Sequence, residues 1–311
     1  MSSDKGPIAV TGASGLLGAN LVLELARRKG PVVALYGCNP IVIEGVRSAA
    51  CDLTDRPATQ RLLGLLAPSL VIHCAAATNV DWCETHPRAC LRINAEAAGD
   101  LAGQARAIGA AFVYISTDSV FDGVSGGYRE TDPVAPVNSY ARSKVAGEAA
   151  VRRAMPQALV LRVNLYGWDL QGRQRLAEWI LSRLEGGQPV PGFRDVTFAP
   201  VLANQLAGWI LDLTEADCAG IYHVASSDPC SKYDFARQIA EVFHLDPSLI
   251  RESRLEVSAR SAPRPHHTWL RTEKVTAALG RSMPSIREGL EEFRALRENG
   301  FFQRLKAAAT G

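Results

Sequence analysis

Short apolar runs alternate with longer amphipathic stretches through the first half of this chain. Apolar runs of four or five residues are typical of strands buried on both faces, and apolar positions three or four residues apart are typical of helices that pack on a sheet. Strands separated by helices with short connections predict a parallel, doubly wound α/β sheet with right-handed crossovers. We expect its six strands at residues 8–10, 32–36, 47–50, 70–74, 112–116 and 159–163.

The pattern changes after residue 166. Beyond it we expect helices at 174–184, 203–213 and 232–243, a Pro-containing loop at 186–194 and a strand at 220–225. This mixture indicates a smaller α/β cap, and substrate pockets favour the boundary between two such units. We therefore divide the chain into a nucleotide-binding domain, residues 1–166, and a mainly substrate-binding domain, residues 167–311, of which some segments can return to the first domain.

A glycine-rich turn joins the first strand to the first helix. Its glycines Gly12, Gly15 and Gly18 follow the spacing TGxxGxxG. Glycines let the backbone turn tightly and approach a pyrophosphate, whose charge is stabilised at a helix N-terminus. A tight turn with a close packing contact is the alternative explanation. Because the turn follows the first strand, opens the first helix and has a second strand within about thirty residues, its context favours dinucleotide binding.

Three side chains with complementary chemistry follow the fifth strand. Thr117 stands at the strand's C-terminal end, where open α/β sheets bind ligands. Tyr140 and Lys144 are one turn apart in a helix expected at residues 139–153. A lysine ammonium stabilises a phenolate and so lowers the tyrosine pKa from about 10, while a threonine hydroxyl can hold a substrate oxygen beside the phenol. The three groups could therefore polarise and protonate a carbonyl. A chance pair on a solvated helix is the alternative for Tyr140 and Lys144.

Other strand ends carry candidate cofactor contacts. The Asp52 carboxylate and the backbone amide that follows it could form hydrogen bonds with the edge of an adenine. The alternative is a helix N-cap supplied by Thr54 or Asp55. The small residues 75–77 would let a flat cofactor lie close to the backbone. Asn94, inside an expected helix, either faces solvent or bridges toward the fifth strand, and the sequence leaves both open.

Composition and charge narrow the class of protein. The 311 residues include 34 basic and 32 acidic side chains, and the resulting net charge of +2 argues against a nucleic-acid partner. Residues 1–6 are polar and lead directly into the first strand, so we expect no signal peptide. The longest apolar region, residues 62–77, is interrupted by Pro68, Ser69 and His73 and is too short to span a bilayer. We expect a cytoplasmic protein that has no membrane partner.

The seven cysteines form neither Cys-x-x-Cys pairs nor groups with His at zinc spacing. Reduced, structural thiols are the default interpretation, and Cys74, inside an apolar strand, is expected to behave as a small hydrophobe. We expect no metal site.

With these residues in place, the chain resembles the extended short-chain dehydrogenase/reductases. The closer likeness is to the dTDP-4-dehydrorhamnose reductase branch, which also includes the regulatory beta subunit of methionine adenosyltransferase. The likeness covers nearly the whole chain and implies a Rossmann-type fold with a smaller C-terminal substrate-binding domain. It rests on the glycine turn and on residues 52–53, 116–123, 140–144, 147–148, 220–223 and 264–265.

The resemblance implies hydride transfer from NADPH or NADH to a keto carbon of a nucleotide-linked 4-keto sugar. Tyr140 would protonate the oxygen, Lys144 would bind the nicotinamide ribose and tune Tyr140, and Thr117 would orient the carbonyl. The expected cofactor contacts are Gly12, Ser14, Gly15, Leu16, Leu17, Gly18, Asp52, Leu53, Cys74, Ala75, Ala76, Ala77, Asn94, Ser116, Tyr140, Lys144 and Val163. The expected substrate contacts are Thr78, Asp118, Ser119, Phe121, Asn164 and Arg264.

Arg264 belongs to a basic, Pro-containing segment, residues 260–270. Its positive charges suit a wall of the pocket that reaches a phosphate, and a solvated loop is the equally favoured alternative.

Charge also bears on the choice of cofactor. A site that prefers NAD has Asp or Glu at the end of the second strand to accept the ribose 2′-hydroxyl, and that carboxylate would repel a 2′-phosphate. Residues 35–39 contain no acid. We therefore expect NADPH to be preferred and NADH to be possible, although no Arg stands immediately beside this place and Arg47 would have to fold back.

Two departures from the family pattern concern the sugar pocket. Ser119 and Leu165 stand where the reductases commonly have an aromatic residue and a Trp, so we expect a sugar other than dTDP-4-dehydrorhamnose. A non-catalytic NADP-binding regulatory subunit and a nucleotide-sugar epimerase are the alternatives. A dehydratase is disfavoured because Asp118 is not followed by the second acid that such enzymes need. The sequence leaves a homodimer open.

Overall fold

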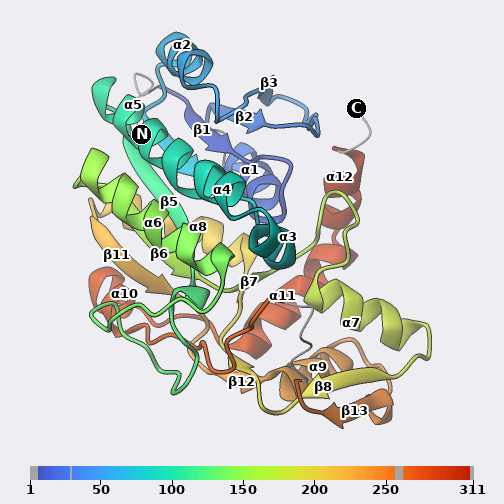
Figure 1. The fold of residues 1–311 in the computed structure, drawn as a ribbon. Coiled ribbons are helices and arrows are strands. Elements are labelled where there is room, and N and C mark those ends of the chain that lie inside the picture. Colours follow the sequence, from blue (N-terminus) through green and yellow to red (C-terminus); the bar gives the residue numbers. More distant parts are fainter. Residues whose placement is uncertain (1–5, 29, 256–261, 309–311) are drawn as a thin grey trace.

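The computed structural model describes residues 6–28, 30–255 and 262–308. Its centre is a sheet of seven parallel strands in the order β11-β6-β5-β4-β1-β2-β3 (Figure 1). The order reverses between β1 and β4, so the sheet is doubly wound as predicted, and its ligand-binding end lies at the carboxyl ends of these strands. The strands are β1 (Ile8–Thr11), β2 (Val32–Tyr36), β3 (Arg47–Ala50), β4 (Leu70–His73), β5 (Ala111–Thr117), β6 (Leu159–Val163) and β11 (Gly220–Val224).

Helices cover both faces of this sheet. Neighbouring residues of a strand face opposite layers, which explains why the buried strands are apolar at consecutive positions. Ala9 packs in one hydrophobic layer and Val10 in the other. The layer of Ala9 is completed by α2 (Arg56–Leu66), α5 (Ala97–Ala107) and α6 (Ser139–Ala154), and the layer of Val10 by α1 (Leu16–Arg27) and α8 (Ala203–Glu215).

A smaller unit lies at the carboxyl end of the sheet, at the lower right of Figure 1. Within the described residues it contains three two-stranded sheets, formed by β7 (Leu165–Tyr166) with β10 (Val201–Leu202), β9 (Thr197–Phe198) with β12 (Cys230–Ser231), and β8 (Val190–Phe193) with β13 (Ile250–Ser253). The remaining helices are α3 (Val80–Thr85), α4 (Pro87–Leu91), a π-helical turn η1 (Arg92–Glu96), the 3-10 turns η2 (Asp118–Val120) and η3 (Pro247–Leu249), α7 (Leu176–Glu185), α9 (Lys232–Val242), α10 (Glu273–Leu279), α11 (Ile286–Glu298) and α12 (Phe301–Ala307).

Two expectations for the second half of the chain need correction, although the domain division allowed some segments to return to the first domain. The strand expected in the cap at residues 220–225 is β11, which pairs with β6 and forms one edge of the main sheet. Helix α8, which precedes it, packs in the same layer as α1. The sequence shows that a strand is present but not which partner satisfies its backbone groups. The expected loop at residues 186–194 likewise contains β8, which pairs with β13 some sixty residues later.

A buried ion pair fixes α6 against the sheet. The Arg162 guanidinium on β6 donates to both carboxylate oxygens of Glu148 on α6, at 2.9 and 2.8 Å. The side chains of this pair are 4% and 6% exposed. Ser116 on β5 donates to the same carboxylate at 2.5 Å. The pair therefore joins α6 to two neighbouring strands just behind the ligand-binding end of the sheet.

Loss of Glu148 should be far more costly than loss of a surface carboxylate. In Glu148→Ala the buried Arg162 charge has no counter-ion, and we expect the free energy of unfolding to fall by about 3–5 kcal/mol. Glu291→Ala removes a carboxylate that is 56% exposed and paired with Arg287, so its effect should stay within about 0.5 kcal/mol. Urea denaturation of both variants followed by tryptophan fluorescence measures the difference. Equal losses would show that the buried pair contributes no more than the surface pair.

Candidate active site

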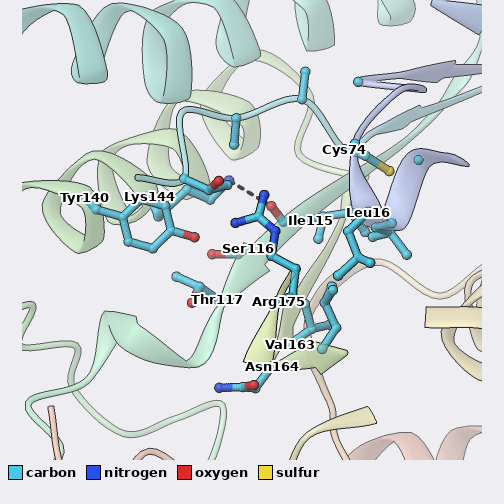
Figure 2. Close-up of a pocket in the computed structure, with 18 of the residues that line it drawn as sticks. Leu16, Cys74, Ile115, Ser116, Thr117, Tyr140, Lys144, Val163, Asn164 and Arg175 are labelled. Carbon is cyan, nitrogen blue, oxygen red and sulfur yellow. Dashed lines mark hydrogen bonds between the residues drawn. The ribbon is translucent and has the colours of Figure 1, made fainter. Parts of the chain in front are cut away.

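A cavity of about 560 Å³ opens at the carboxyl ends of the central strands (Figure 2). It brings together most of the residues that the sequence singled out. Of the expected cofactor contacts, it is lined by Gly12, Ser14, Gly15, Leu16, Leu17, Gly18, Cys74, Ala75, Ala76, Ser116, Tyr140, Lys144 and Val163. Of the expected substrate contacts, it is lined by Thr78, Asp118, Ser119 and Asn164. The role of each residue stays a prediction.

The glycine turn combines close packing with free donors. A Cβ on Gly12, whose φ is +65°, would lie 2.7 Å from the backbone of Ala75, and a Cβ on Gly18 would lie 2.2 Å from the carbonyl oxygen of Gly12. The packing alternative thus accounts for two of the three glycines. Gly15 is the N-cap of α1, which has no capping side chain and no acid in its first turn. The helix therefore presents backbone N–H groups and a positive dipole end to the cavity.

Thr117, Tyr140 and Lys144 meet in this cavity (Figure 2). Thr117 ends β5, and the other two lie in the first turns of α6, whose N-cap is Asn138. The Nζ of Lys144 donates to the backbone carbonyl of Ile115 at 2.8 Å. The lysine is thereby held against the strand that carries Thr117, and the two helix residues face the cavity rather than solvent on the outer face of the helix.

Burial controls the charges of these groups. It raises the pKa of Tyr140 well above its usual range, and the neighbouring Thr117 hydroxyl lowers that pKa by a smaller amount. The net shift of the Tyr140 pKa is therefore upward, opposite to the expected lowering, because desolvation is its largest cause. Burial also lowers the pKa of Lys144 to about 7, against the opposing effect of the Glu148 carboxylate.

Asp118 lies at the centre of a hydrogen-bond network on the substrate side. Its Oδ2 accepts from the amide of Asn164 at 2.8 Å and from the hydroxyl of Thr268 at 2.5 Å. Its Oδ1 accepts from the hydroxyls of Thr117 at 3.1 Å and Ser119 at 3.2 Å. Burial raises the pKa of this carboxyl, and the four hydrogen bonds oppose that rise. Through Asp118, the network connects the Thr117 hydroxyl to Asn164 in the first domain and to Thr268 near the C-terminal end.

Asn94 supports the cavity from behind. It is 1% exposed in the π-helical turn η1. Its side chain exchanges hydrogen bonds with the backbone of Ala77 at 2.8 and 3.0 Å and donates to the Ser143 hydroxyl on α6 at 2.9 Å. The backbone carbonyl of Asn94 accepts a hydrogen bond from the hydroxyl of Tyr114 on β5 at 2.9 Å. The solvated alternative is therefore wrong, and the bridge to the fifth strand is made by the main chain.

Several expected contacts do not line the cavity, namely Asp52, Leu53, Ala77, Asn94, Phe121 and Arg264. Asp52 accepts from the backbone and hydroxyl of Thr54 in a local turn, and Leu53 packs against the hydrophobic layer of Ala9. Asp55 is the residue that caps α2. A local hydrogen bond is therefore sufficient to explain the acid at position 52.

Phe121 and Arg264 are engaged elsewhere. Phe121 is fully buried, with its ring stacked 4.2 Å from that of Tyr128. Arg264 forms an ion pair with Asp81 at 2.9 Å and donates to the carbonyl of Ala262 at 2.8 Å. The basic segment still reaches the site through Thr268, while its first two positions, 260 and 261, lie outside the described residues.

Four polar side chains of the cavity wall were not predicted from the sequence. The cavity is also lined by Asn39, Gln171, Arg173 and Arg175. The last three lie in the loop that follows β7. The two closely spaced arginines of this loop were the only feature of the sequence that could have indicated a binding role. In the described part of the chain, no three His, Cys, Asp or Glu side chains gather to hold a metal, and no helix is long and apolar enough to cross a membrane.

Comparison with known proteins shows which family this chain is similar to. The profile of the family described as "RmlD substrate binding domain" matches residues 6–298. A probable low-salt glycan biosynthesis reductase, Agl14, from Haloferax volcanii is 37% identical over 92% of this chain and 96% of its own length. The dTDP-4-dehydrorhamnose reductase of Mycolicibacterium smegmatis is 32% identical over 92% and 84%. Methionine adenosyltransferase 2 subunit beta of Bos taurus is 31% identical over 92% and 86%.

A solved structure has the same architecture. The dTDP-4-dehydrorhamnose reductase of Bacillus anthracis, in complex with NADP, matches with a TM-score of 0.82 and 28% identity over 94% of this chain and 99% of its own. The resemblance inferred from the sequence motifs is confirmed by these matches. The chain belongs to the family of the RmlD substrate-binding domain, together with the dTDP-4-dehydrorhamnose reductases.

Proposed function

We propose that this protein is an NADPH-dependent reductase of a nucleotide-linked 4-keto sugar. The observation that carries the proposal is the meeting of Thr117, Tyr140 and Lys144 in one cavity with the glycine turn, in a chain whose relatives include dTDP-4-dehydrorhamnose reductases. We assign it to the extended short-chain dehydrogenase/reductases. Its location in the cytoplasm and its assembly as a homodimer remain predictions from the sequence.

The size and the lining of the cavity support a dinucleotide as its occupant. Cavities of a few hundred Å³ to about 1,000 Å³ are typical of ligand sites, and the uncapped N-terminus of α1 opens into this one. Gly15 and the first turn of α1 would hold the pyrophosphate, and Ala75 and Ala76 would allow the adenosine half to lie close to the backbone. Lys144 would hold the nicotinamide ribose. When bound, the reduced cofactor supplies a hydride.

The residues of the cavity would handle the proton and the carbonyl. Because its pKa is raised, Tyr140 keeps its proton at neutral pH and can act as a general acid toward the keto oxygen. The Thr117 hydroxyl donates to Asp118 in this structure. It would donate to the keto oxygen instead when the substrate is bound, because a hydroxyl has one donor and a keto oxygen only accepts. The Lys144 ammonium would stabilise the phenolate left after proton transfer. Asp118 is itself held by Asn164 and Thr268, so the two domains place the carbonyl together.

The sugar is expected to differ from dTDP-4-dehydrorhamnose. Ser119 and Leu165 line the cavity in this chain, and the resemblance places larger aromatic residues at these positions in the reductases. Smaller and more flexible side chains change the shape of the space around the sugar. A panel of nucleotide-linked 4-keto sugars tested for NADPH oxidation would identify the preferred one. Absence of turnover with every member would count against the reductase assignment.

A regulatory subunit is the second candidate. The 31% identity to the bovine adenosyltransferase beta subunit over 92% of the chain favours it. Such a subunit would bind the cofactor but act by association with an enzyme. Recovery of an adenosyltransferase in stoichiometric amount from the source cell, together with an inactive keto-sugar panel, would support this alternative over the reductase.

Replacement of the proposed acid should abolish turnover without loss of cofactor binding. In Tyr140→Phe we expect kcat for keto-sugar reduction to fall by about 10²–10⁴-fold, the usual contribution of a positioned acid. The Kd for NADPH should stay within about threefold, because a phenyl ring keeps the packing of the cavity. Tyr233→Phe, on α9 in the smaller unit, is the control and should retain full activity. Full activity in Tyr140→Phe would exclude this tyrosine as the acid.

Stability should depend on pH through Lys144. Its pKa is about 7 in the folded protein and about 10.5 in the unfolded chain. Between these values the unfolded chain binds more protons, so the free energy of unfolding rises with pH. Lys144→Met removes this contribution. From pH 6 to pH 8.5 we expect the wild type to become more stable relative to Lys144→Met by about 2 kcal/mol.

Urea denaturation without cofactor at both pH values measures this difference. Lys274→Met removes an exposed lysine and should follow the wild-type curve. If wild type and Lys144→Met change in parallel, the lysine is not destabilised by burial.

A further inference from the structure

The segment between β7 and α7 lies across the cavity from the loops of the first domain. We call residues 169–175 the arginine segment. Its Gln171 donates from Nε2 to the backbone carbonyl of Ser14 in the glycine turn at 3.2 Å. Gln171 also accepts from the side chain of Asn39, just beyond β2, at 3.2 Å. The segment is thus joined to the two places that face the phosphates of a dinucleotide in this class of fold.

Two guanidinium groups of this segment face the cavity with few protein partners. Arg173 and Arg175 both line it, and their side chains are 49% and 41% exposed. Figure 2 shows the Arg175 side chain extending from the side of Val163 toward Ile115 and Ser116. Among the described residues, Asp169 is the only carboxylate within 4.0 Å of either guanidinium, at 3.8 Å from Arg173 and 3.5 Å from Arg175.

These ion pairs leave most of the hydrogen-bonding capacity of both arginines unused. A guanidinium has five N–H donors in a planar fork. Within the described part of the chain, neither Asp169 Oδ2 nor Arg175 Nε has a hydrogen-bond partner. The second oxygen of Asp169 accepts from the backbone of Gln171 at 2.8 Å. Asp169 therefore positions the two arginines by charge but does not satisfy their donors.

Two walls of the cavity carry positive charge, and on one of them Asp169 neutralises part of that charge. One wall is the uncapped N-terminus of α1, and the other carries Arg173 and Arg175. Two positive walls repel each other unless an anion lies between them, and a guanidinium matches a phosphate in bidentate geometry.

We propose that Arg175, assisted by Arg173, binds a phosphate group of the dinucleotide cofactor from the side opposite the glycine turn. The inference rests on the proposed function, because it takes the occupant of the cavity to be NADPH. Arg175 would supply the positive charge that the residues after β2 lack. The smaller unit thereby contributes to cofactor binding as well as to substrate binding.

The test is the affinity of the full-length protein for NADPH and NADH in the absence of sugar. Isothermal titration should show that Arg175→Ala binds NADPH about tenfold or more weakly than wild type, and Arg173→Ala by a smaller factor. Equal weakening of both cofactors assigns Arg175 to the pyrophosphate. Weakening of NADPH alone assigns it to the 2′-phosphate. Either result supports a phosphate contact.

The controls separate this inference from the proposed function. Arg152→Ala removes an exposed arginine from α6 and should bind both cofactors like wild type. Arg175→Gln keeps a polar but shorter, uncharged side chain and provides a second variant if Arg175→Ala unfolds, which a thermal melt without cofactor would reveal. If wild type binds NADPH and the folded Arg175 variants bind it within twofold, the inference is overturned and the reductase proposal stands. If wild type itself binds neither cofactor, the proposed function fails.

Discussion

The site depends on the placement of α6 against the carboxyl end of β5. A buried ammonium needs an acceptor, and Lys144 finds one in the Ile115 carbonyl at 2.8 Å, at the point where the strand approaches the cavity. One turn further along the helix, Glu148 meets Ser116 and Arg162. These bonds fix both the rotation of α6 and its position along the strand. Tyr140 on α6 is therefore held in the same cavity as Thr117, which ends β5.

The same burial that holds the helix also sets its chemistry. Desolvation disfavours the charged form of each group, so Tyr140 keeps its proton while Lys144 is close to losing its own. The phenol therefore holds the proton that a general acid must supply, and its raised pKa makes it a weaker acid than a solvated tyrosine. Asp118 experiences the same penalty but is compensated by four hydrogen bonds. A carboxylate surrounded in this way is better suited to orienting the Thr117 hydroxyl than to exchanging protons itself.

The second half of the chain completes both ends of the cavity. Thr268 approaches Asp118 on the substrate side, and the arginine segment approaches the glycine turn on the cofactor side. Lys306 of α12 reinforces the latter, donating to the backbone carbonyl of Asp169 at 2.7 Å. The division into two domains is thus less sharp in space than along the chain, since β11 and α8 also join the main sheet and its helical layer.

The sequence by itself determined the features that depend on local order. Periodicity located the six central strands, glycine spacing located the turn, and the one-turn interval placed Tyr140 and Lys144 on the same face of α6, because all three follow from backbone geometry over a few residues. Only the tertiary structure decided the partner of β11, the burial of Phe121, the direction of the Tyr140 pKa shift and the approach of Arg175. Each of these depends on desolvation or contact between segments that are far apart along the chain, which no local pattern encodes.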